Sequence, residues 1–286
     1  TLAESSAVAD AELFVCLDID AGKRGERAEA QVRIASGVER EWLPRERVRS
    51  AVAVLFDERV ERVTAVKRTV FEDLVLDEVQ AGLPDDGEPS RVLAEAAAKR
   101  FERVWPKDDK DVERFVARVR CLGAWMPDLG LPNADEAWLA GALPDLCHGR
   151  RSFDELRRAP WLEALQGRLS YAQLQILERE APDKLSVPSG SQIRIEYEPG
   201  KAPVLAARIQ ELFGLAETPR IAGGRVGVVM HLLAPNHRPQ QITEDLRSFW
   251  DNTYPQVKKE LSRRYPRHSW PDDPWSATPE RRPRRR

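Results

Sequence analysis

Residues 235–275 read PNHRPQQITEDLRSFWDNTYPQVKKELSRRYPRHSWPDDPW, and this stretch decides the fold of the C-terminal part of the chain. Thr243 stands where a helix N-cap is expected, because its hydroxyl can accept a hydrogen bond from an unpaired amide of the first turn. Leu246, Phe249 and Trp250 follow at the spacing that places apolar side chains on one helical face. The stretch therefore predicts an amphipathic helix with a buried apolar face.

A second helix is predicted to begin at Pro255. This residue lacks the amide hydrogen that a helix interior uses, so the first helix should break just before it. Val257 and Leu261 then share an inward face. The helix should end before Pro266, because the residue preceding a proline is disfavoured in the helical conformation.

The outward side of this second helix and the loop after it are basic. Lysine and arginine neutralise phosphates, and an exposed aromatic side chain can stack on a base. The residues predicted to contact nucleic acid here are Lys258, Lys259, Arg263, Arg264, Arg267, His268 and Trp270. The alternative is a solvated helix face, with Trp270 and Trp275 sealing the edge of a domain.

The run QITEDLRSFWDNTYPQVKKELSRRYPRHSWPDDP, residues 241–274, resembles the C-terminal signature of the bacterial HrpB-type ATP-dependent helicases, of the DEAH/RHA group. Two further segments resemble the same family, LSVPSGSQIRIEY at 185–197 and AARIQELFG at 206–214. The strand-like segment ELFVCLDID at 12–20 does so too. The resemblance covers nearly the whole chain but only the C-terminal part of such a helicase.

This resemblance implies a parent that is an ATP-dependent RNA helicase, whose two motor domains would lie N-terminal to Thr1. The sequence contains no GxxxxGK[ST] loop to hold phosphates and no DEAH tetrad. ATP and magnesium would therefore belong to the parent motor domains, and we expect no cofactor and no catalytic residue in this chain. The implied partners are its own N-terminal helicase domains and single-stranded RNA or DNA.

Residues 1–82 are predicted to form a small OB-like β-barrel. Five short alternating segments with one inserted helix or loop suit such a barrel, and the resemblance also places an OB-like domain there. The pattern alone equally permits another small barrel or sheet. Lys23, Arg24 and Arg27, in the first glycine-containing turn, are a second candidate nucleic-acid contact.

The spacing of apolar residues changes twice in the rest of the chain. Residues 90–182 have helical spacing and are predicted to form a helical domain, and residues 186–275 a mixed α/β module. Residues 276–286 are predicted to be a disordered basic tail. The predicted class is α+β, with an OB-like barrel, a helical middle segment and a mixed C-terminal module.

Charge is divided unevenly along a chain whose formal net charge is −2. From residue 236 to the end there are 12 Lys/Arg against 7 Asp/Glu, a net of +5, which leaves −7 for the remainder. Such a basic end attracts polyanions. The alternative is a basic tail that only keeps the protein soluble. We expect no small-molecule substrate.

Other classes of protein are disfavoured. The three cysteines and four histidines have neither disulfide-framework nor metal-site spacing, and no apolar run is long enough to span a membrane. The first residues lack the order of a secretory signal, so we expect a cytoplasmic protein without membrane contact. Two hypotheses remain open, a nucleic-acid-contacting accessory region and a protein-docking module without nucleic-acid binding.

Overall fold

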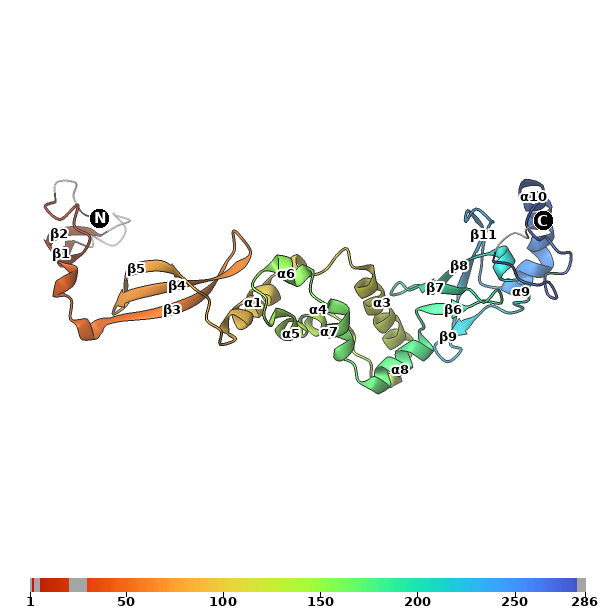
Figure 1. The fold of residues 1–286 in the computed structure, drawn as a ribbon, viewed down its shortest axis with the longest axis horizontal. Helices are drawn as coiled ribbons and strands as arrows, with labels where there is room; N and C mark the ends of the chain where they lie inside the picture. The colour runs from red at the N-terminus through yellow and green to blue at the C-terminus, as the bar shows by residue number, and fades with distance from the viewer. Residues whose placement is uncertain (1, 3–5, 21–29, 282–286) are drawn as a thin grey trace. The chain divides into compact units, whose positions relative to one another are not determined.

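The computed structural model describes residues 2, 6–20 and 30–281, and the chain divides into two compact units (Figure 1). Unit 1 covers Thr1–Val92 and unit 2 covers Leu93–Arg286. The described residues combine several sheets with many short helices, so the predicted α+β class is confirmed at that level. No helix in the described part is long and apolar enough to span a bilayer.

Unit 1 contains two small antiparallel sheets. The first pairs β1 with β2, and the second has the order β3-β4-β5. Short 3-10 turns at 40–42 and 45–47 precede the second sheet. The strands are β1 (Phe14–Asp20), β2 (Gln31–Gly37), β3 (Val48–Asp57), β4 (Arg62–Phe71) and β5 (Leu74–Ala81).

The described part of unit 1 contains no closed barrel, so the OB-like barrel predicted for residues 1–82 is not confirmed. Strand alternation in a sequence predicts which residues share a face, but closure depends on which strand edges pair. The only hydrophobic side chains buried among the described residues of these strands are Val54, Val63 and Ala65. Unit 1 therefore encloses little core of its own.

Unit 2 begins with short helices packed around Trp161. This side chain is buried, its Nε1 donates to the carbonyl of Leu156 (2.7 Å), and its ring meets those of Phe101 and Trp105 edge-on. Tryptophans in a helical segment are expected in the core by default, but Trp105, Trp125 and Trp138 are only half-buried. Helix α1 (Glu88–Lys99) begins within unit 1 and ends within unit 2. The helices after it are α2 (Phe101–Val104), α3 (Lys110–Trp125), α4 (Glu136–Ala140), α5 (Leu143–Cys147), α6 (Phe153–Arg157), α7 (Trp161–Gly167) and α8 (Tyr171–Glu180).

Helix starts in this segment follow local capping rules. Ser170 and Gln173 have capping-box spacing in the sequence, and they form the reciprocal capping box at the start of α8. Asn133 is a candidate cap by residue type for the helix that carries Trp138, but Asp135 caps this helix instead, and its carboxylate accepts from the amide of Trp138. Both residue types cap well, so the choice between neighbouring positions depends on the path of the preceding loop.

A five-stranded sheet follows, with the order β12-β11-β8-β7-β6. β8 and β11 are parallel and the other neighbours are antiparallel. The strands are β6 (Lys184–Ser186), β7 (Gln192–Glu196), β8 (Val204–Arg208), β11 (Val229–Leu233) and β12 (Pro239–Thr243), with β9 (Arg220–Ile221) and β10 (Val226–Gly227) paired separately. The sequence of residues 203–213 favours a short helix, but only Ile209–Glu211 form a 3-10 turn. The parallel partner β11 draws Val204–Arg208 into the sheet as β8.

The helical and sheet segments of unit 2 are tied together. The hydroxyl of Tyr197 donates to the carbonyl of Pro182 (2.7 Å), and its ring lies 6.1 Å from that of Trp125. The amide of Ala222 donates to the carbonyl of Glu180 (2.8 Å). The boundary between the predicted helical domain and the predicted mixed module thus falls inside one compact unit, and the division remains a prediction.

The helical part of residues 235–275 is continuous through Pro255. It consists of α9 (Leu246–Ser248), a π-helical turn at Phe249–Thr253 and α10 (Tyr254–Arg264). The predicted break is wrong, because the wider π turn takes up the amide-less proline without ending the helix. The predicted cap is also wrong, since Asp245 accepts from the amide of Ser248 (2.9 Å).

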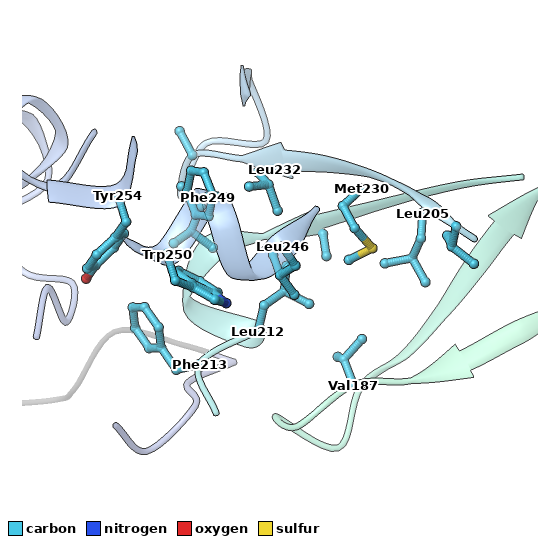
Figure 2. Packing of buried hydrophobic residues seen from close by; sticks show 14 of the residues in the cluster. Val187, Leu205, Leu212, Phe213, Met230, Leu232, Leu246, Phe249, Trp250 and Tyr254 are labelled. Carbon is cyan, nitrogen blue, oxygen red and sulfur yellow. The ribbon is translucent and has the colours of Figure 1, made fainter. Parts of the chain in front are cut away.

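The apolar faces of this helix fill the core of the sheet, as predicted. Figure 2 shows Leu246, Phe249, Trp250 and Tyr254 turned toward the buried side chains of the sheet and toward Phe213. Ring centroids lie 5.3 Å apart for Trp250 and Tyr254 and 5.9 Å apart for Phe213 and Trp250. We call this group, together with Trp275, the aromatic cluster.

Replacing Trp250 by alanine is expected to destabilise unit 2 by about 3–5 kcal/mol, because it removes the ring in the middle of the aromatic cluster and leaves a cavity. Urea unfolding followed by circular dichroism measures this. Trp42→Ala, at a tryptophan that is 68% exposed in unit 1, is the control and should have little effect. Equal effects of the two substitutions would contradict the assigned core.

Candidate nucleic-acid interface

The outer face of α10 carries a row of exposed cations. Lys259 and Arg263 lie one helical turn apart, and both are exposed, whereas Leu261 on the opposite side is 1% exposed. Among the described residues no ion pair is recorded for Lys259, Arg263 or Arg267. This arrangement leaves three positive charges available to an external anion.

The other two basic residues of α10 already have neighbours. Lys258 is half-buried and pairs with Asp272, a residue of the loop that follows the helix. The guanidinium of Arg264 lies 5.7 Å from the ring centroid of Tyr265, within the range of a cation–π contact. Arg267 is the basic residue nearest to Asp272 in the sequence of this loop, but the fold pairs Asp272 with Lys258 instead.

Trp270 holds the loop in place. Its Nε1 donates to the carbonyl of Tyr265 (3.0 Å), and its half-buried ring packs against the core of the sheet. These contacts occupy the indole nitrogen and part of the ring, in keeping with an edge-sealing role. Stacking of this ring on a nucleobase therefore stays an untested prediction.

His268 lies where three distant segments meet. Its ring contacts that of Tyr265 edge-on at 6.2 Å. Burial lowers the pKa of His268 below its ordinary value, nearby Arg208 lowers it further, and Glu280 acts in the opposite direction. The ring is therefore mainly neutral at neutral pH, so its contribution is packing and not charge.

Residues 271–281 form a segment that we call the strap, which runs back along the module. The hydroxyl of Tyr254 donates to the carbonyl of Pro271 (3.0 Å), and the amide of Gly214 donates to the carbonyl of Pro274 (2.9 Å). The amide of Glu280 donates to the carbonyl of Gln210 (2.9 Å). Residues 276–281, predicted to begin a disordered tail, thus have defined contacts, while 282–286 lie outside the described residues.

Lys23, Arg24 and Arg27 also lie outside the described residues. The structure therefore describes only one of the two predicted groups of nucleic-acid contacts, the group on α10 and its loop. The residues that sequence reasoning missed are those on other segments near this loop, Arg208 and Arg281. The arginine-rich end of the sequence was a signal for Arg281, but nothing local marked Arg208.

The described residues contain no group of three or more histidine, cysteine or acidic side chains placed to hold a metal ion. Asp273, one of the paired aspartates, instead accepts from the amide of Trp275 (2.9 Å) and from the hydroxyl of Ser276 (2.6 Å). These hydrogen bonds lower the pKa of Asp273 below its ordinary value. Its carboxylate thus has a structural role in the turn that begins the strap.

Comparisons with known proteins agree on one family. Residues 138–274 match the family described as ATP-dependent helicase C-terminal. The ATP-dependent RNA helicase HrpB of Escherichia coli (strain K12) is 42% identical over 176 residues, which are 60% of this chain and 22% of that protein.

Two solved structures resemble the chain over most of its length. The crystal structure of the E. coli DExH-box NTPase HrpB gives a TM-score of 0.67 at 31% identity, covering 97% of this chain and 35% of that one. The crystal structure of the Escherichia coli DEAH/RHA helicase HrpB gives 0.60 at 29% identity, covering 94% and 34%. The chain therefore spans about a fifth of the curated relative and about a third of the solved ones.

The three cysteines are expected to differ in reactivity. Burial raises the pKa of Cys121 to about 11 and that of Cys147 to about 12, so both stay protonated thiols at pH 8, whereas Cys16 is half-buried in unit 1. Iodoacetamide should label Cys16 in the native protein and all three residues in urea, as read by peptide mass spectrometry. Rapid native labelling of Cys147 would contradict its burial.

Proposed function

We propose that this chain, which carries the C-terminal domain of the HrpB-type ATP-dependent helicases, is an accessory region of the helicase motor. It would bind the sugar-phosphate backbone of a single nucleic-acid strand. The motor, with its ATP and magnesium, would lie in the parent's N-terminal domains. RNA is the proposed strand, because the curated relative is called an RNA helicase. The proposed compartment is the cytoplasm.

The observation that supports nucleic-acid contact is the row of unpaired cations on and after α10. Lys259, Arg263 and Arg267 are all exposed. A phosphate that meets such a side chain displaces condensed counterions, which makes binding favourable and dependent on salt. A surface row of this kind holds a backbone without reading its sequence.

A second candidate function is docking on the motor domains, and a different observation favours it. Fourteen large hydrophobic side chains are exposed in the described part of the chain, and all but Tyr171 and Ile242 belong to unit 1. Val52 and Val79 lie on either side of Lys67 in the three-stranded sheet, so both point from the same face. Exposed apolar side chains gathered in one part of a protein are typical of an interface.

Reversing the charges with Lys259→Glu and Arg263→Glu is expected to weaken binding of single-stranded RNA. Each lost phosphate contact should lower the slope of log K against log salt by about 0.7. Fluorescence anisotropy at two or more salt concentrations measures both quantities.

The matched control for this pair is Lys107→Glu with Lys110→Glu. Both residues are exposed in the helical segment, and the change in net charge is the same. Binding should then stay close to that of the unaltered chain. If both double variants lower affinity equally, only overall charge matters, and the α10 face is removed from the proposal.

The docking candidate predicts that Val52→Glu with Val79→Glu abolishes association with the remainder of a HrpB-type helicase expressed separately. Burying two added carboxylates in such an interface costs desolvation free energy, which one neighbouring lysine, Lys67, does not offset. Val60→Glu with Gln80→Glu adds the same charge at a turn and on the opposite face, and should leave association intact. Size-exclusion chromatography of the mixtures separates the cases, and co-elution of the first variant would exclude this face.

A further inference from the structure

The C-terminal strap ends beside the loop that carries the basic residues after α10. The Nη2 of Arg208, the last residue of β8, donates to the carbonyl of Arg281 (2.6 Å), and the preceding amide, of Glu280, is held by Gln210. Ala277, in the middle of the strap, packs against the hydrophobic core. The path of the chain up to Arg281 is thus fixed by the sheet.

The anchor for this end of the strap is itself rigid. Glu211 is 7% exposed and accepts from Arg208 Nε (3.0 Å) and from the hydroxyl of Ser191 (2.7 Å). Burial opposes ionisation of Glu211, but these hydrogen bonds outweigh it and lower its pKa below the ordinary value. The carboxylate of Glu211 therefore fixes the position of Arg208, and Nη2 of Arg208 points to the strap.

The side chain of Arg281 lies next to Gly190, where the absence of a Cβ leaves room for it. Gly190 has a φ of +75°, and a Cβ on that residue would lie 3.1 Å from Nη2 of Arg281. A larger residue at 190 would be strained and would crowd the guanidinium. The loop around Gly190 thus leaves room for the arginine, and no ion pair to an acid is recorded for Arg281 within the described part of the chain.

His268 connects this arginine to the loop after α10. It follows exposed Arg267 directly, and both Arg208 and Glu280 are near enough to act on its charge. Trp270 of the loop and Ala277 of the strap pack against the same hydrophobic core, so both segments lie on the module that contains the end of β8. Arg267 and Arg281 are exposed residues of these two segments.

We infer that Arg267 and Arg281 belong to one phosphate-binding surface, which continues the cation row of α10 across the end of the strap and takes the phosphodiester backbone of a single strand. This inference rests on the proposed nucleic-acid contact and extends it to a second segment. A bound strand would thereby join the strap to the helix.

The test compares binding of a labelled oligonucleotide of about eight uridines to the full chain and to Arg267→Ala and Arg281→Ala, between about 50 and 200 mM salt. The second substitution keeps the backbone carbonyl that Arg208 holds. Each variant should lower affinity and reduce the salt slope by about 0.7. The control is Arg238→Ala, at an exposed arginine of the β11–β12 hairpin, which should bind like the unaltered chain.

Other results overturn the inference in distinguishable ways. If the unaltered chain does not bind the oligonucleotide, the proposed nucleic-acid contact fails together with it. If Lys259→Glu with Arg263→Glu weakens binding but Arg281→Ala behaves like Arg238→Ala, the proposed function stands and the shared surface is wrong. If Arg281→Ala weakens binding only of a longer strand of about 24 uridines, the strap is a separate site.

Discussion

Unit 2 depends on the packing of Trp250 against Tyr254 and Phe213. This contact joins three segments, since Phe213 follows β8, the other two residues belong to the long helix, and Trp275 of the strap closes on Trp250 at 6.5 Å. Polar ends of the same rings then hold the surrounding loops, because Trp250 Nε1 donates to the carbonyl of Leu215 (2.9 Å). A large ring with one polar atom can fill a core and anchor a loop at once.

The position of the basic face follows from that packing. Leu261 and Val257 are drawn inward, so Lys259 and Arg263 must point away from the sheet. The strap returns across the module because its carbonyls are held by Tyr254 and Gly214, and this return brings Arg281 to the end of β8. Core contacts thus place charges that are themselves exposed to solvent.

Unit 1 contrasts with unit 2 in how its apolar residues are used. Its strands contain many β-branched and aliphatic residues, yet Val54, Val63 and Ala65 are the hydrophobic residues buried there among those described. A small sheet that buries few side chains is marginal alone, because the buried surface barely offsets the entropy of ordering. The exposed apolar residues of unit 1 are the reason that docking on a partner is kept as the second candidate function.

Sequence alone determined the features that depend on local periodicity and chain chemistry. The spacing of Leu246, Phe249 and Trp250 identified the buried helical face, Pro266 marked its end, and the strands of unit 1 were recognisable from alternation. Tertiary structure decided what depends on distant partners: β8 became a strand beside β11, Pro255 was accommodated by a π turn, and Asp272 paired with Lys258. Barrel closure and the neighbours of Arg281 belong to this second group, because pairing between segments far apart leaves no periodic signal in either of them.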